Sequence, residues 1–270
     1  MTFDEPITLS EAMKILAAKK LLPTSLDTAG LRQLDAADRA QSVFSAQTTN
    51  EYLLQLYRDR IGGILNPEPA EGEATTQFSP DYVRQSIKQF LQEIGYEPAP
   101  DDAGTLKDLS SDARINLVIK TNTELAQGQG LWIANQNPVI LDEWPAQELF
   151  RAEARQQPRE WLQRWRLAGD QTGDPIGTGW TITPDERMIA LKNHDIWDWI
   201  GSSDLFDDAL DFIWPPFAFN SGMWVRDVDR ATTEAIGLMQ KGDAAPAPMN
   251  IADALKAFTE KISVFAKEAA

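Results

Sequence analysis

The chain contains no cysteine and only one histidine, His194, among its 270 residues. The lack of cysteine excludes disulfide bonds, thiolate zinc sites and cysteine nucleophiles. One imidazole cannot build a histidine-rich metal site, although carboxylates alone can hold Mg²⁺ or Ca²⁺. No stretch approaches the roughly 18 apolar residues of a membrane-spanning helix, and the N-terminus lacks a basic and apolar secretory signal. We therefore expect no membrane association and no secretion.

Positive charge is also scarce, because 25 lysines and arginines stand against 41 acidic residues, for a formal net charge of −16. Such a chain repels nucleic-acid backbones and anionic membranes unless it has a local basic patch. The densest basic stretch contains five arginines interrupted by glutamates: Arg151, Arg155, Arg159, Arg164 and Arg166. We interpret it as a mixed-charge helical face, with a DNA-binding surface as the alternative, so direct nucleic-acid binding is not expected.

Sequence motifs of common enzymes are missing. The chain has no Gly-x-Ser-x-Gly elbow, and Gly128-Gln-Gly130 lacks the later glycine and lysine of nucleotide-binding loops. We interpret these glycines as a helix end. His194 is interpreted as a surface or helix-end residue, with a catalytic role beside Asp195 as the alternative. The sequence predicts no catalytic residue, no cofactor and no bound metal.

Clusters of aspartates offer the remaining acid–base or cation-binding chemistry. One pair stands at Asp101-Asp102, and a second group would share one side of a helix near 204–211: Asp204, Asp207, Asp208 and Asp211. Solvated acidic faces of this kind are common in a strongly acidic protein. We interpret both clusters as solvent-exposed surface and keep a hard-cation or acid–base site as the alternative.

Apolar spacing indicates a mostly helical chain. Helices are predicted over residues 8–22, 49–61, 79–95, 110–130, 145–157 and 158–169, with shorter helical segments near 27, 204–211 and 227–239. Residues 177–183 are rich in glycine and threonine and predict a small hairpin. The fold class expected is mainly α, an irregular helical domain with a short-strand region, and α+β is the alternative.

Three regions follow from the composition. An N-terminal helical region covers 1–66, and an acidic, proline-containing loop at 66–77 separates it from a domain at 78–240. A Pro/Ala linker at 242–249 leads to an amphipathic helix at 250–270. Five apolar residues form its a/d seam and are a candidate interface: Ile251, Leu255, Phe258, Ile262 and Phe265. Docking on another chain and folding back on the same domain are both open.

All nine tryptophans lie between Trp132 and Trp224. Their centre is the run from Trp214 to Trp224, in which two prolines exclude a helix interior or central strand. Indole rings bury large apolar areas, so this run must pack against something. The pairs Trp161/Trp165 and Trp197/Trp199 are interpreted as core or interface residues, and stacking on a planar ligand is the alternative.

Two stretches carry a family resemblance. Residues 114–122 (Arg-Ile-Asn-Leu-Val-Ile-Lys-Thr-Asn), followed by a glycine-containing segment, are similar to a helix of the phage Mu F-like and SPP1 gp7-like minor head (head-morphogenesis) proteins. The run 214–222 resembles the late aromatic element of the same family. The residues that carry these motifs are Arg114, Thr121, Asn122, Trp214, Pro215, Pro216, Phe219 and Asn220. The resemblance covers about residues 80–240.

The resemblance implies a structural role in a virion. Such a protein associates with the portal or the major capsid protein, acts in head assembly or DNA packaging, and is located in the virion head or, during assembly, in the bacterial cytoplasm. Self-association into a portal-bound connector ring is one alternative. A nucleotide-binding enzyme of ADP-ribosyltransferase type, using Arg114, Asn122 and Glu124, is the other. Many members end the late element with Asn-Cys-Arg-Cys, whereas Asn220-Ser221-Gly222-Met223 stands here, so no metal site follows from the family.

Overall fold

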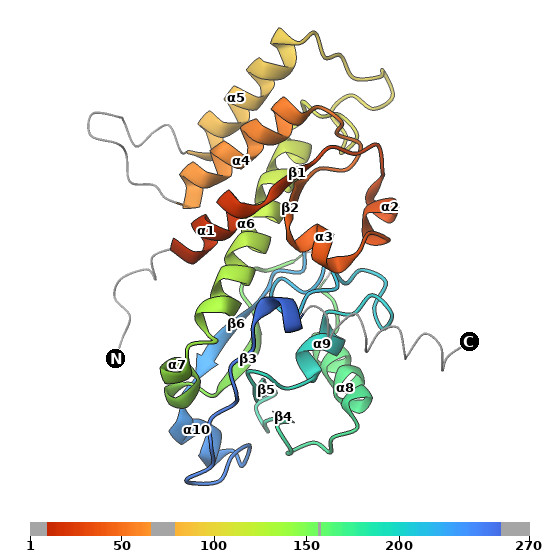
Figure 1. The fold of residues 1–270 in the computed structure, drawn as a ribbon. Coiled ribbons are helices and arrows are strands. Elements are labelled where there is room, and N and C mark those ends of the chain that lie inside the picture. Colours follow the sequence, from red (N-terminus) through yellow and green to blue (C-terminus); the bar gives the residue numbers. More distant parts are fainter. Residues whose placement is uncertain (1–9, 66–78, 156–157, 255–270) are drawn as a thin grey trace. The chain divides into compact units, whose positions relative to one another are not determined.

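The structure is a computed structural model that describes residues 10–65, 79–155 and 158–254. The chain divides into two compact units, Met1–Gly130 and Leu131–Ala270, and each is described by itself (Figure 1). The loop at 66–77, expected to join two regions, lies outside the described residues. That joint and the region boundaries drawn from it stay predictions.

Unit 1 combines helices with one pair of parallel strands. Its elements are α1 (Ser10–Ala18), β1 (Lys20–Leu22), α2 (Thr28–Arg32), α3 (Ala36–Ala40), β2 (Ser42–Phe44), α4 (Glu51–Leu65), α5 (Pro80–Glu93) and most of α6 (Asp112–Ala134). β1 pairs with β2 in parallel, with Leu21 opposite Val43. The long helices α4 and α5 lie side by side (Figure 1).

The core of unit 1 confirms the helical stripes expected from the sequence. Residues at three- and four-residue spacing on α4, α5 and α6 share one apolar cluster, which includes Leu53, Tyr57, Ile61, Ile87, Leu91 and Ile115. Ser79 caps α5 by accepting a hydrogen bond from the backbone N–H of Tyr82. Gly95, with φ of 70°, follows the end of this helix as expected.

Unit 2 is built around a four-stranded antiparallel sheet in the order β4-β5-β3-β6. Its elements are α7 (Pro138–Glu143), β3 (Ala146–Arg151), α8 (Trp161–Thr172), β4 (Trp180–Ile182), β5 (Met188–Leu191), α9 (Ile196–Ile200), β6 (Met223–Val228) and α10 (Arg230–Ala235). One sheet face packs against α8 and α9 in a tryptophan-rich core. Ile236 and Leu238, which follow α10, pack against the other face.

The sheet corrects the expected fold class, because the protein is α+β and not mainly α. The helix predicted over 145–157 is wrong, since these residues form β3 in the centre of the sheet. Residues from Ala146 to Leu149 are all buried, including the polar Gln147 and Glu148, so apolar and polar positions do not alternate along the strand. A short run buried on both faces cannot be told from a helix by its period.

Three further predictions are corrected. The helical segment predicted near 204–211 is a series of turns. The predicted helix at 227–239 is instead the end of β6 followed by the short α10. Gly130 lies inside α6 and does not end it. A Cβ at this position would come within 2.7 Å of the backbone nitrogen of Ala12 on α1. This glycine permits close helix packing.

Residues 177–183, predicted to form a hairpin by themselves, instead supply one strand of one, since β4 pairs with β5 across the turn at 183–187. Within the described ranges, no helix is long and apolar enough to cross a membrane.

Candidate functional site

Arg114 and Asn122 of α6 hold the segment that follows β2. The Arg114 side chain is buried, and its Nη2 donates to Ser45 Oγ at 2.7 Å and to the carbonyl of Ala46. The Asn122 amide donates to the carbonyl of Phe44 at 3.0 Å and accepts from the N–H of Phe44 at 3.2 Å. One side chain thus bonds both backbone groups of a strand residue, as a neighbouring strand would.

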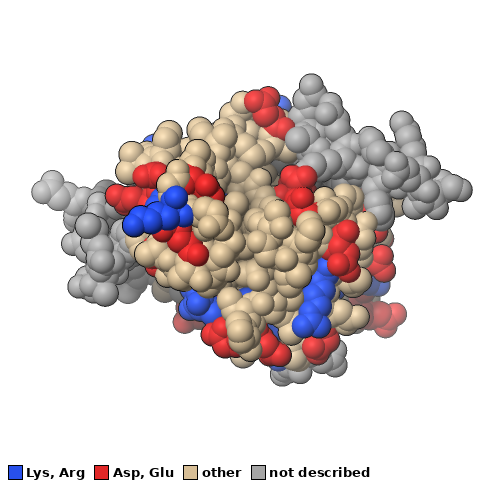
Figure 2. Space-filling model, turned by 90° about the horizontal axis from the view of Figure 1, so that it is seen from below, with Lys and Arg blue, Asp and Glu red and all other residues tan. Residues whose placement is uncertain are grey.

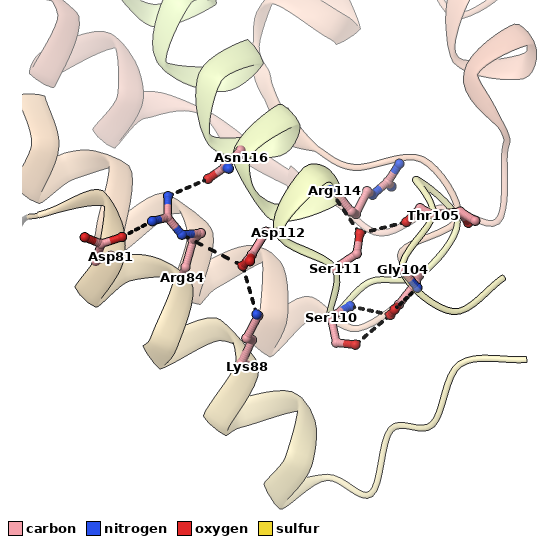
Figure 3. A network of polar contacts seen from close by, with 11 residues as sticks. Asp81, Arg84, Lys88, Gly104, Thr105, Ser110, Ser111, Asp112, Arg114 and Asn116 are labelled. Carbon is pink, nitrogen blue, oxygen red and sulfur yellow. Dashed lines mark hydrogen bonds and ion pairs between the residues drawn. The ribbon is translucent and has the colours of Figure 1, made fainter. Parts of the chain in front are cut away.

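The start of α6 is fixed by a network of short-range polar contacts (Figure 3). The Ser111 hydroxyl donates to the carbonyl of Thr105 and accepts from the N–H of Arg114. Asp108 accepts from Ser110 and from the N–H of Gly104. Burial alone would raise the pKa of Asp108, but these hydrogen bonds hold it below its ordinary value. Thr121, the third motif residue of this helix, is half-buried.

The aromatic run of unit 2 is buried as expected. Trp214 is 1% exposed and stacks on Phe212, with ring centroids 5.2 Å apart, and its ring also lies 5.9 Å from that of Trp132. Phe217 stacks on Trp197 at 5.7 Å. Both prolines, Pro215 and Pro216, are buried as well. The run has no regular secondary structure until β6 begins at Met223, in agreement with its two prolines.

The core interpretation of the paired tryptophans is confirmed. All four rings belong to the cluster between the sheet and α8 and α9: Trp161, Trp165, Trp197 and Trp199. Trp165 and Trp197 contact each other edge to face, with centroids 5.1 Å apart. Because these rings are at most 8% exposed, they pack against protein atoms.

The arginines of the basic stretch bind the end of the aromatic run. Arg155 Nε donates to the carbonyl of Asn220 at 3.0 Å, and Arg159 Nη2 donates to the carbonyl of Phe219 at 2.8 Å. Asn220 has a left-handed backbone with φ of 48°, which asparagine tolerates better than most residues. This stretch is therefore not the helical face we predicted, because only its second half, from Trp161, is in α8.

Asp208 is held by two guanidinium groups, those of Arg159 and Arg164. Burial alone would raise the pKa of Asp208, but both arginines lower it. The turn structure separates the cluster, so Asp204 and Asp207 are exposed and Asp211 is buried. Over the described ranges, no three histidine, cysteine or acidic side chains form a group that could hold a metal ion.

His194 has a hydrogen-bond partner on Nδ1 and a carboxylate near Nε2. Its Nδ1 accepts from the N–H of Ile196 at 3.1 Å, at the start of α9, and its Nε2 lies 3.3 Å from an Asp174 carboxylate oxygen. Burial lowers the pKa of His194, although Asp174 and Asp195 oppose this shift. The helix-end interpretation agrees with this geometry.

Glu148 is a buried charge that the sequence interpretation missed. It lies on β3, 3% exposed, and its carboxylate accepts two hydrogen bonds from Arg187 and two from Arg226, at 2.6–3.0 Å. Burial alone would raise the pKa of Glu148, but the arginines hold it below its ordinary value. Arg226 stands directly opposite Glu148 in the β3–β6 register. Only a correct strand assignment could have found this pair.

The Pro/Ala linker is tied to unit 2 along much of its length. The Asn193 amide donates to the carbonyl of Ala247, and Gln136 Oε1 accepts from the N–H of Met249 at 2.9 Å. Beneath it lies a cleft of about 480 Å³ lined by apolar residues such as Leu191, Leu238 and Pro246. Residues 251–254 are helical and include Ile251. The other four residues of the predicted interface lie outside the described residues: Leu255, Phe258, Ile262 and Phe265.

Comparison with known proteins gives no relative, since no protein-family model, no curated protein and no solved structure matches the chain.

Proposed function

We propose that this chain is a structural component of a phage or prophage virion, a minor head protein that contacts the portal or the major capsid protein. One observation supports a structural role. Two residues that carry the family resemblance use side-chain polar atoms to hold residues 44–46: Arg114 through Nη2 and Asn122 through its amide. The resemblance supplies the virion context, with the protein in the virion head or, during assembly, in the bacterial cytoplasm.

The same observation favours this role over nucleotide binding. A nucleotide site would need the Arg114 guanidinium and the Asn122 amide to face a ligand. Both are buried and already bonded to backbone atoms, while Glu124 lies 3.2 Å from Lys120 on the same helix. Rearranging them would leave buried polar groups of residues 44–46 without partners, at a cost of about 1–3 kcal/mol each. A nucleotide-binding enzyme is therefore treated below as an outcome that would overturn the structural proposal.

Particle association tests the proposal. The full chain is co-expressed with the products of the neighbouring genes, and assembled heads are separated from free protein on a density gradient. We expect the chain to sediment with the heads. A variant lacking residues 255–270 keeps Ala254, which is 1% exposed, and should unfold in urea in a cooperative transition like that of the wild type. Loss of particle binding by this folded variant would assign docking to the terminal segment.

The alternatives are distinguished by native mass spectrometry and by the effect of NAD on unfolding. A closed ring formed by the chain alone, seen by native mass spectrometry, would favour a portal-bound connector. A chain that stays at the top of every gradient, and whose unfolding temperature rises with NAD, would overturn the structural proposal. If the chain is such an enzyme, the variant Asn122→Ala should no longer show the rise in unfolding temperature with NAD.

A further inference from the structure

The outer side of the α4–α5 pair in unit 1 carries a groove with aromatic walls. Tyr52, Leu56 and Arg60 follow one another at four-residue spacing, so they share one face of α4. The groove has a volume of about 390 Å³ and is lined by Leu56, Arg60, Tyr82, Gln85, Ser86, Gln89, Phe90 and Glu93. Tyr52 is 79% exposed beside it. Exposed aromatic side chains that gather in this way mark interaction surfaces.

Arg60 stands at one end of the groove without an anionic partner in the described chain. Its guanidinium lies over the Tyr82 ring, 5.1 Å from the centroid, and its Nε is buried with no hydrogen-bond partner among those residues. Arg60 as a whole is half-buried, and a partly desolvated cation of this kind is stabilised when a carboxylate reaches it. The groove therefore favours an occupant that brings an acidic side chain to Arg60.

The neighbouring side of α5 behaves differently, although it also carries basic residues. Arg84 contacts Asp81, Asn116 and Asp112, and the Lys88 ammonium lies 2.8 Å from Asp112 (Figure 3). These cations are already neutralised within unit 1. The helix pair thus allows a comparison between the paired cations of α5 and Arg60 of α4.

Glu93 supplies a carboxylate at the opposite end of the groove. It is eleven residues beyond Tyr82 on α5, which corresponds to about 16 Å along the helix axis. One Glu93 oxygen accepts from Gln89 at 2.9 Å, and the side chain is exposed. The groove therefore has a cation at one end, a carboxylate at the other, and Leu56 and Phe90 between them.

We propose that the α4–α5 groove is a self-association surface for a second copy of this chain, related by a two-fold axis. A two-fold axis through the middle of the groove brings Arg60 of each copy to the partner's Glu93. Leu56 and Phe90 of both copies then pack in the centre, between the two ion pairs. A second copy fits this charge pattern twice, whereas any other occupant needs a matching pattern of its own. The inference is independent of the virion role.

Charge reversal tests the inference by sedimentation equilibrium of the full chain. The wild type is expected to dimerise. Arg60→Glu and Glu93→Arg should each weaken dimerisation by more than about 100-fold, because each creates two like-charge contacts across the axis. The double variant Arg60→Glu/Glu93→Arg should restore the dimer. Lys88→Glu changes the charge by the same amount as Arg60→Glu, on the other side of α5, and should leave the dimer intact.

Cysteine crosslinking locates the interface, because the native chain has no cysteine. Gln89 lines the aromatic groove near its middle, whereas Gln92 lines only the polar side of α5. A Gln89→Cys variant should form a covalent dimer under mild oxidation, much faster than Gln92→Cys. A wild-type monomer would overturn the inference, and so would a dimer that ignores both charge reversals and the position of the cysteine. Circular dichroism confirms that each variant is folded.

Discussion

Single side chains in this protein take over tasks that secondary structure usually performs. The Asn122 amide bonds the free backbone groups of Phe44, and Arg155 and Arg159 bond the carbonyls that end the aromatic run. Irregular segments cannot satisfy their own backbone polar groups, so buried ones need side-chain partners. The polar motif residues are therefore tied to the fold at the level of individual hydrogen bonds.

Lys19 gives a prediction at this scale. Its side chain is buried and donates to the carbonyl of Ala40 at 2.5 Å, and burial lowers the pKa of Lys19 to about 7. Between pH 7 and about pH 10.5, Lys19 binds its proton more tightly in the unfolded chain than in the folded one. The free energy of unfolding should therefore rise with pH in this window, by up to about 1.4 kcal/mol per pH unit. Lys19→Met should remove this contribution.

The measurement is urea unfolding followed by circular dichroism at several pH values between 7 and 10. The stability difference between Lys19→Met and wild type should favour the variant most at pH 7 and shrink as the pH rises. Lys20→Met, at the exposed neighbouring position, is the control and should follow the wild-type profile. A pH-independent difference between Lys19→Met and wild type would contradict the prediction.

Elements with one buried face were predictable, and elements buried on both faces were not. The stripes of α4, α5 and α8 follow from apolar spacing because one side of each helix meets the core. β3 was not predicted, because it is buried by its neighbours β5 and β6 and by the layers on both faces of the sheet. Sequence spacing reports which side of an element is buried, and β3 has no exposed side between Ala146 and Leu149.

Two glycines inside helices of unit 1 allow the effect of close packing on stability to be compared with the effect of helix propensity. A Cβ at Gly130 would meet the backbone of Ala12 at 2.7 Å, whereas one at Gly62 would meet only Leu16 Cδ2 at 3.9 Å. Gly130→Ala should destabilise the protein by about 1–3 kcal/mol through overpacking. Gly62→Ala should be neutral or stabilise it by up to about 1 kcal/mol. Urea unfolding of both variants checks this, and equal effects would show that the α1–α6 approach is not tight.

On the scale of the whole molecule, acidic character is combined with extensive internal pairing of the basic groups. On the face shown in Figure 2, basic side chains lie beside acidic ones. The arginines at 155, 159, 164, 187 and 226 all have carboxylate partners within their unit. The net charge of −16 therefore acts without a local basic patch from these residues to offset it.

Heparin chromatography at low salt tests this charge argument. We expect the full chain to pass through the column, because its net charge repels the polyanion and three arginines of the basic stretch, Arg155, Arg159 and Arg164, are already paired with carboxylates. The same protein on an uncharged matrix is the control. Tight retention that salt reverses would contradict the expectation. It would favour the alternative that the arginine stretch binds nucleic acid.

The sequence by itself determined the excluded chemistry, the helices with one apolar stripe and the burial of the tryptophan-rich run, because composition and local spacing carry that information. Tertiary structure alone decided that residues 146–151 and 223–228 pair in one sheet, that Glu148 meets Arg226, and that Arg60 has no anionic partner among the described residues. Each of these depends on which distant segments lie together. Pairing between distant segments is set by the packing of the whole unit, and local periodicity contains no record of it.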